Sequence, residues 1–560
     1  MKVDSEVIPG TIQLVDLKGD PDYNAVDHEI VLVPTPSADP DDPLNWSQRR
    51  KWLSMLCMVL YTLGVGVPTA SIFSVLLPIS EKTNLSLADL NEGTGYMFLM
   101  LGFGCLFWQP VALQFGKRPV YLISILGTMA VQIWAPYTKN NGQWIGHKIL
   151  QGFLGAPIES LCEVTVSDIW FEHERGSWMG LYAFMMLFGS FMAPFFGGFI
   201  TQGMDWKWVL FWGAIFDAVV FVFLFFFFEE TNYSRKAELE RECMESETLD
   251  VAHGGAVLPV GSGSFNDSSD QNEKGSANRV DVIPNPFSNG ETAACGVPAK
   301  IYKPKTFWDK LKLFDKPRPN MLWTMVKRPI IILFSFPPVI YAGFLYGTGL
   351  IWFSVLNATA SKILSEPPYN FKPSMVGVAY LCPTIITAIV AWYGGWLGDR
   401  LRIWMAKRHG GISEAEDRLW LLALYMVMCP AGLILWGIGA AHGIHWFGLV
   451  MGLGITGGFG VLAGLCSVNY AVDCYREMAS ESMVPLIIIR NCMGFGMGYA
   501  ITPWLTNEGL QRCFGEAAGV SVFCIGMFLF MIAFGKKFRI ATRHRYWKFV
   551  QESIENDMAH

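Results

Sequence analysis

Long apolar segments alternate with short polar ones along most of the 560-residue chain. Each apolar segment is close to the ~20 residues that a helix needs to cross a bilayer. The segments lie at 53–76, 94–113, 119–137, 145–167, 177–200, 208–228, 330–356, 375–397, 418–440, 446–470, 483–505 and 516–535. The pattern predicts an all-α membrane protein with twelve transmembrane helices.

A long polar segment separates the sixth apolar segment from the seventh. Its middle, residues 254–296, is rich in Gly, Ser, Asn and Asp, a composition typical of disordered linkers. Because this composition cannot bury a core, we expect the segment to be dispensable for transport. The predicted parts are a cytoplasmic N-terminal tail (1–52), an N-terminal six-helix half (53–228), a cytoplasmic linker (229–329), a C-terminal six-helix half (330–535) and a cytoplasmic C-terminal tail (536–560). Two such halves favour a substrate site between them, near the middle of the membrane.

Composition and charge support this interpretation. The chain is 52% hydrophobic and only 16% charged, which excludes an ordinary soluble protein. Most of its 42 Lys and Arg fall in the tails, the linker and the loops on one side, which predicts that both termini are cytoplasmic. Asn84, in the first outer loop, is then a candidate for glycosylation, as is Asn357 next to the seventh helix, whereas Asn266 in the linker is not. The 12 cysteines lie without metal-type spacing, so no metal or cofactor is expected.

Small residues recur in the fifth segment at fixed spacings, in a pattern that also contains a proline. They are Gly180, Gly189, Ala193, Pro194, Gly197 and Gly198. Small side chains let helix backbones approach closely, and a proline bends the helix. The complete spacing resembles the antiporter motif of proton-coupled drug exporters in the major facilitator superfamily, with Ala193 where that family usually has Gly. The resemblance implies export in exchange for protons, and tight packing is expected in either case.

Two loops resemble the superfamily's cytoplasmic gating motif. Residues 395–400 read Gly-Trp-Leu-Gly-Asp-Arg, and the resemblance implies that Asp399 pairs with an Arg. In residues 109–119, Leu113 and Gln114 replace the family's Asp and Arg, so the gating motif of the first half is altered. The cytoplasmic charges assigned to gating are Lys117, Arg118, Asp168, Arg175, Asp399 and Arg400. A purely topological role for Lys117 and Arg118 stays open.

The fourth segment carries most of the charge that is expected inside the membrane. Lys148 precedes Gln151-Gly152 as an Arg does in a family motif, although a snorkelling lysine explains it equally well. Glu159 and Glu163 are four residues apart and share one helix face. Charges at this depth are costly and mark functional sites, and two stacked carboxylates favour protonation of one of them. Glu159 is the first candidate for proton and substrate coupling. A fixed salt bridge is the alternative.

Further polar residues lie in the sixth and eleventh segments. Asp217 is either a second coupling acid or a buried partner of a basic group. Arg490, followed by Asn491, is either a structural counter-ion or a ligand for an anion. Aromatic residues such as Tyr346 could line a cavity for organic cargo, but facing lipid is their commoner role, so none is assigned.

Four short motifs narrow the resemblance. They lie at residues 42–47, 229–233, 404–408 and 472–475. They resemble the fungal twelve-span drug:proton antiporter family, in the branch that includes the yeast transporter of polyamines and other cations. In that branch an acid of the fourth span is implicated in cation transport, and Glu159 matches its position.

The resulting hypothesis is a monomeric, proton-coupled transporter of small organic molecules in the plasma membrane, with the lipid bilayer and protons as its other partners. Efflux of xenobiotics or a fungal metabolite is expected first, and uptake of polyamines or other organic cations is the alternative. The chain has no HExxH, P-loop or GxSxG motif, which argues against an enzyme. Its short C-terminal tail argues against a membrane sensor. Nothing in its composition indicates a nucleic-acid partner.

Overall fold

The computed structural model describes residues 8–13, 39, 41–233, 322–408 and 412–555. The expected linker, including Asn266, lies outside the described residues. The described chain is almost entirely helical, apart from one pair of short strands, β1 (Thr11–Gln13) and β2 (Ile412–Glu414).

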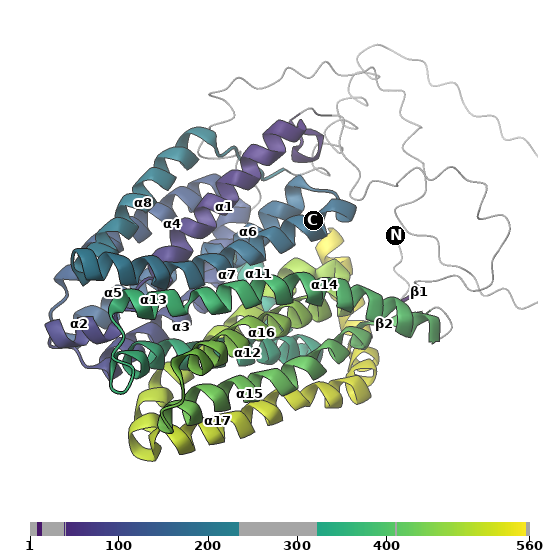
Figure 1. The fold of residues 1–560 in the computed structure, drawn as a ribbon. Helices are drawn as coiled ribbons and strands as arrows, with labels where there is room; N and C mark the ends of the chain where they lie inside the picture. The colour runs from purple at the N-terminus through teal and green to yellow at the C-terminus, as the bar shows by residue number, and fades with distance from the viewer. Residues whose placement is uncertain (1–7, 14–38, 40, 234–321, 409–411, 556–560) are drawn as a thin grey trace, which may run out of the picture. The chain divides into compact units, whose positions relative to one another are not determined.

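The first half of the bundle is built from eight helices. They are α1 (Gln48–Ala70), α2 (Leu76–Lys82), α3 (Leu87–Phe115), α4 (Lys117–Trp134), α5 (Asn141–Gly155), α6 (Pro157–Ile169), α7 (Glu172–Gly203) and α8 (Trp206–Phe227) (Figure 1). Local chemistry explains several of their ends. Ser86 and Asp89 form a capping box at the start of α3. Pro157 lacks a backbone N–H, so it interrupts the fourth crossing between α5 and α6.

The second half contains the remaining long helices. They are α11 (Leu322–Ser335), α12 (Pro337–Ser365), α13 (Pro373–Ala379), α14 (Leu381–Arg408), α15 (Leu422–Ala441), α16 (Trp446–Cys474) and α17 (Ala479–Glu555), with a 3-10 turn η4 (Ala415–Leu421) before α15. The sequence placed the seventh crossing at 330–356. The helix instead begins at Pro337, because Phe336 is extended and the preceding residues form the separate helix α11. The C-terminal tail predicted after residue 535 continues as helix to Glu555.

The helices that could cross a membrane correspond to the twelve apolar segments of the sequence. Ten helical stretches of the described chain are long and apolar enough to span a membrane. The last of them bends at Gly509, where φ is +74°, and Trp504 Nε1 donates to Glu516 Oε2 at 2.9 Å. Side chains twelve residues apart meet at that distance only if the helix folds back, so this stretch supplies two crossings. The divided helix α5–α6 supplies another, which completes twelve.

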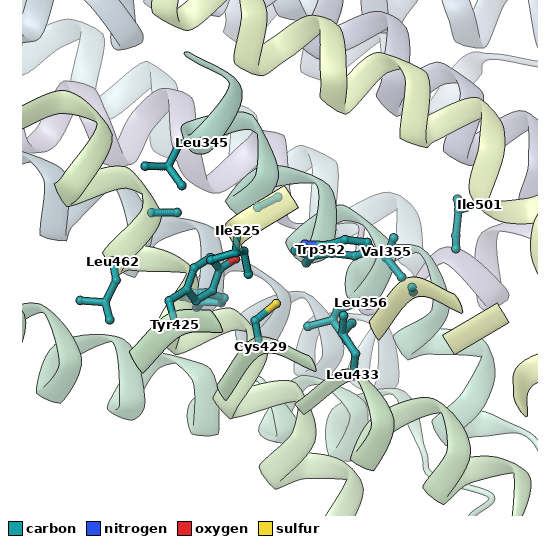
Figure 2. Close-up of a cluster of buried hydrophobic side chains, with 14 of the residues drawn as sticks. Leu345, Trp352, Val355, Leu356, Tyr425, Cys429, Leu433, Leu462, Ile501 and Ile525 are labelled. Carbon is teal, nitrogen blue, oxygen red and sulfur yellow. The ribbon is translucent and has the colours of Figure 1, made fainter. Parts of the chain in front are cut away.

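A continuous apolar core runs through the second half. Leu345, Trp352, Val355 and Leu356 of α12 lie among Tyr425, Cys429 and Leu433 of α15, with Ile525 of α17 nearby (Figure 2). The outer surface is also apolar: Val219, Val427 and Phe523 are more than 60% exposed. A soluble protein rarely exposes this much contiguous apolar surface, whereas a bilayer covers it.

The two ends of the bundle differ in charge. We call the end where α1 starts the basic end, because Arg50, Lys117, Arg402 and Arg539 lie there. The other end, where α1 finishes at Ala70, is called the opposite end.

Candidate functional site

The centre of the bundle holds an ion pair that joins the two halves. Arg490 of α17 donates from Nη2 to Oε1 of Glu159 in α6. Asn491 donates from Nδ2 to the other oxygen, Oε2, at 3.3 Å. Glu159 and Arg490 are each about 7% exposed, and Asn491 is fully buried. The carboxylate of one half is therefore bound by two side chains of the other half.

An aromatic ring completes the surroundings of the Arg490 guanidinium. Its carbon lies 4.5 Å from the ring centroid of Tyr346, which belongs to α12. Glycines allow these helices to come close: a Cβ at Gly102 of α3 would lie 3.0 Å from Asn491 Cβ, and one at Gly347 would lie 3.3 Å from Arg490 Cα. Four helices from both halves thus meet at one buried cation and one buried anion.

Two interface cavities flank this pair along α17. The one toward the basic end is lined by Cys105, Gln109, Val164, Arg328, Glu481 and Val484. The one toward the opposite end is lined by residues that include Phe73, Phe98, Ser354, Gly494, Met497 and Ile501. Because Arg490 lies between Val484 and Gly494, the ion pair separates the two cavities.

Contacts between the halves close the interface at the opposite end. Asn91 Nδ2 donates to Thr502 Oγ1 at 3.1 Å, and Tyr499 donates to the hydroxyl of Tyr96 at 2.7 Å. In the same region a Cβ at Gly498 would lie 2.8 Å from Gly95 Cα, so the two backbones almost touch. These contacts join α3 to the part of α17 that precedes the bend at Gly509.

The expected antiporter motif lies in α7, and its small residues face different neighbours. A Cβ at Gly197 would lie 2.6 Å from Ser71 O, and one at Gly198 would lie 2.3 Å from Pro373 O at the start of α13. Gly189 faces Leu63, whereas Gly180 has open space. Ala193 is buried, and the carbonyl of Pro194 accepts from Ser74 Oγ at 2.7 Å. The C-terminal part of the motif therefore packs α7 against the end of α1 in its own half and against α13 of the second half.

The other acids of the sequence analysis lie apart from the pair. Glu163 is one turn nearer the basic end, and its Oε2 is buried without a hydrogen-bond partner in the described chain. Asp217 is fully buried in α8, where neither oxygen finds a partner among the described residues. Its Oδ1 lies near Gly64 of α1. The structure thus brings Glu159 together with Arg490 and Asn491, but not with Asp217.

Lys148 belongs to a separate polar cluster toward the opposite end. It is buried, and its Nζ donates to Gln151 Oε1 at 2.8 Å and lies 5.2 Å from the ring centroid of Trp144. Eleven residues separate Lys148 from Glu159, which corresponds to ~16 Å along a helix. Lys148 does not reach the ion pair.

At the basic end of the first half, the expected gating residues meet charges of the same half. Lys117 forms an ion pair with Asp168. The backbone N–H groups of Lys117 and Arg118 donate to Glu230 at 3.0 Å each, which satisfies free donors at the start of α4. Arg118 also donates to Phe225 O at 2.6 Å. Arg175 lies in the first turn of α7.

At the basic end of the second half, the charged cluster involves residues that the sequence analysis did not assign. Asp473 at the end of α16 lies 3.3 Å from Arg418 Nε and 3.7 Å from Arg402 Nη1. Arg400 stacks on Trp396, with 4.1 Å from its guanidinium carbon to the ring centroid. The side chain of Asp399 lies outside the described residues. The clustering of Arg near 400 was visible in the sequence, but the choice of Asp473 as partner depends on how α14 and α16 pack.

The two glycosylation candidates differ in exposure. Asn84 is exposed in the connection between α2 and α3. Asn357 is 1% exposed inside α12, which does not suit an acceptor that an enzyme must reach. Asn84 remains the better candidate.

Comparison with known proteins assigns the fold to a family. Residues 54–484 match the model of the Major Facilitator Superfamily. The chain belongs to this superfamily. The superfamily and the fold expected from the motifs are thereby confirmed, and they are those of membrane transporters.

Several fungal proteins of the superfamily are similar to the chain. An uncharacterized MFS-type transporter of Schizosaccharomyces pombe is 31% identical, covering 97% of this chain and 95% of its own. Protein HOL1 of Saccharomyces cerevisiae is 26% identical, with coverages of 92% and 91%. The MFS antiporter QDR3 of Candida albicans is 22% identical, with coverages of 91% and 81%. Among solved structures, the peptide transporter POT has a TM-score of 0.56 at 13% identity, covering 86% of this chain and 94% of its own, which shows the shared fold alone.

Proposed function

We propose that the protein is a proton-coupled antiporter of small organic molecules that exports xenobiotics or a fungal secondary metabolite. In this proposal it acts as a monomer in the plasma membrane, and its basic end, with both termini, faces the cytoplasm. The distribution of Lys and Arg supports this orientation. The Candida relative is named as an antiporter, which supports exchange.

The ion pair between the halves is the observation that carries the proposal. Glu159 belongs to one half, and the groups that bind it, Arg490 and Asn491, belong to the other. A proton on Glu159 removes its charge and with it most of the attraction for Arg490. The halves can then separate at this point, and loss of the proton restores the pair. Proton binding is in this way linked to the relative movement of the halves.

The surroundings of Arg490 support organic cations as a cargo class. Its guanidinium, itself an organic cation, contacts the carboxylate of Glu159 and the ring of Tyr346. These two groups attract it by charge and by cation–π attraction. A cationic substrate that displaced Arg490 would find the same two groups. This arrangement also supports the alternative function, proton-coupled uptake of polyamines or other organic cations, because the same site would serve either direction of transport.

The test is transport by purified protein in proteoliposomes that contain a pH-sensitive dye. Candidate cargo includes a fluorescent organic cation and a radiolabelled polyamine. Glu159→Gln keeps the shape of the side chain and removes the titrating group, so we expect at least a tenfold loss of proton-driven net transport. Asp205→Asn is the matched control, since Asp205 pairs with the exposed Lys82 at the opposite end. Full pH-dependent transport by Glu159→Gln would overturn the proposal.

A second measurement on the same variant separates protons from cargo. Exchange of labelled for unlabelled substrate needs no pH gradient. It survives in Glu159→Gln if the residue handles only protons, and it falls in parallel with net transport if Glu159 also binds the cationic cargo.

The orientation has its own test. Asn84 is exposed at the opposite end, and we expect it to be glycosylated when the chain is made in a eukaryotic cell. The measurement is a mobility shift that disappears in Asn84→Gln. A shift caused by modification at Asn266 instead would reverse the proposed orientation.

A further inference from the structure

A short segment near the N-terminus lies on the second half of the bundle. We call residues 8–13 the N-terminal strap. Its strand β1 pairs antiparallel with β2, with Thr11 opposite Glu414, Ile12 opposite Ser413 and Gln13 opposite Ile412 (Figure 1). The strap precedes α1 of the first half by about 35 residues, yet its partners come from the loop after α14 and from α17.

A buried arginine donates hydrogen bonds to a backbone carbonyl and to one hydroxyl of the strap. Arg539 is fully buried, and its Nη1 donates to Pro9 O at 2.5 Å and to Thr11 Oγ1 at 3.3 Å. Its Nη2 donates to Glu414 at 2.7 Å and to Glu416 at 2.5 Å. The strap thus supplies two of the acceptors of a guanidinium that has no access to water. Without the strap, Nη1 loses both of these acceptors.

Glycine is required at the centre of the strap. Gly10 has φ of +80°, a conformation that residues with a side chain rarely adopt. A Cβ there would lie 2.9 Å from Arg539 Nη1, 3.0 Å from Asp473 O and 3.1 Å from Cys474 Cα. Two of these three neighbours are backbone atoms at the end of α16, which cannot move aside cheaply. The surface therefore selects a glycine at position 10, by close approach, and a hydroxyl side chain at position 11, by hydrogen bonds.

The strap also touches the charged cluster of the second half. Gly10 lies against the backbone of Asp473, whose carboxylate faces Arg402 of α14 and Arg418 of η4. Thr11 Oγ1 donates to Glu414 Oε2 at 3.0 Å, and Glu414 also pairs with Lys536. Segments from α14, η4, α16 and α17 therefore converge where the strap binds.

We propose that the strap is a peptide ligand held in cis, and that β2, Arg539 and the end of α16 form its binding site. Occupancy of the site keeps the basic-end charges of the second half in place. The strap and β2 form a two-stranded sheet, in which main-chain hydrogen bonds provide affinity and the glycine and threonine provide specificity. The inference depends neither on the cargo nor on proton coupling.

The test uses the chain without residues 1–13 and a synthetic peptide that covers residues 6–16. We expect truncation to lower the melting temperature of the purified protein in detergent by at least ~3 °C, and saturating peptide to restore it. Peptides carrying Gly10→Val or Thr11→Val are matched controls and should fail to restore it. An unchanged melting temperature after truncation, or equal rescue by the Gly10→Val peptide, would overturn the proposal.

A second measurement covers the case in which the truncated chain does not fold. Ile12→Cys and Ser413→Cys place two thiols at directly opposed positions of the full-length chain. Mild oxidation should link them, and a protease cut introduced between residues 14 and 38 should then leave the N-terminal fragment attached until a reductant is added. Release of the fragment without reductant would show that the strap does not occupy this site.

Discussion

Two buried acids in the membrane interior, Glu159 and Asp217, have the same chemistry and opposite surroundings. Glu159 lies where the halves meet, and two side chains of the other half bind its oxygens. Asp217 lies inside the first half, near Gly64 of α1, with no partner for either oxygen among the described residues. An ionised carboxylate costs several kcal/mol at such depth unless it is paired. The comparison supports Glu159 rather than Asp217 as the proposed coupling acid, because only Glu159 has partners in the other half among the described residues, and movement of the halves would separate it from them.

The largest effect is expected when the pair loses its cation. Arg490→Met leaves the Glu159 carboxylate buried without its charged partner, and we expect a loss of about 3–5 kcal/mol in the free energy of unfolding at pH 8. Glu159→Gln combined with Arg490→Met removes both charges and should recover most of the stability. Denaturant unfolding in detergent measures all three. Additive losses in the double variant would mean that the two residues do not form a pair.

The next effect concerns contacts between the halves and uses two glycines of one motif. Gly198→Val places a side chain against Pro373 O, so we expect about 1–3 kcal/mol of destabilisation and slower transport. Gly180→Val is the matched control, because a Cβ at Gly180 meets nothing within 4 Å. Thermal unfolding and initial rates of flux distinguish them. Similar behaviour of both variants would show that the close approach of α7 to α13 is not needed.

A smaller effect is expected at the unpaired acid. Asp217→Asn replaces a carboxyl that has no hydrogen-bond partner among the described residues by an amide of the same shape, so the free energy of unfolding should change by less than about 1 kcal/mol. The pH profile of transport should also stay as in the unaltered protein. The measurement is flux against pH for Asp217→Asn and Glu159→Gln side by side. If Asp217→Asn lost pH dependence as well, the comparison between the two acids would fail.

The smallest effect concerns Glu414, a carboxylate outside the membrane spans. Burial alone would raise its pKa, but hydrogen bonds from Lys536 and Arg539, the charge of Arg539, and Thr11 hold that pKa below its ordinary value. Its backbone N–H donates to Asp417, and Glu416 shares Arg539 with it. A lowered pKa keeps these pairs intact at every pH above the ordinary range of Glu, and they weaken only as the pH falls through the lowered value. Binding of the strap peptide should therefore be unchanged between pH 8 and pH 6. A clear loss of binding within that window, measured by fluorescence anisotropy, would contradict this assignment.

The class of protein and the approximate positions of its membrane crossings follow from the sequence alone. The bilayer requires ~20 consecutive apolar residues for each crossing, and such a run can be recognised locally in the sequence. It also singled out Glu159, Asp217 and Arg490, since charge inside an apolar segment is visible without any structure. It missed the separate helix before Pro337 and the continuation of the last helix to Glu555, because helix ends depend on packing and on the extended conformation of a single residue.

Which charges pair with one another depends on the tertiary structure. Arg490 binds Glu159 across 331 positions of the chain, while Asp217 finds no described partner and Asp473 faces Arg402 and Arg418. The strap is a further case, since its residues 11–13 pair with residues more than 390 positions away. Partner choice depends on which faces of the helices pack together. When most faces are apolar, the local sequence does not specify that packing, because many pairings of helices bury similar apolar surface.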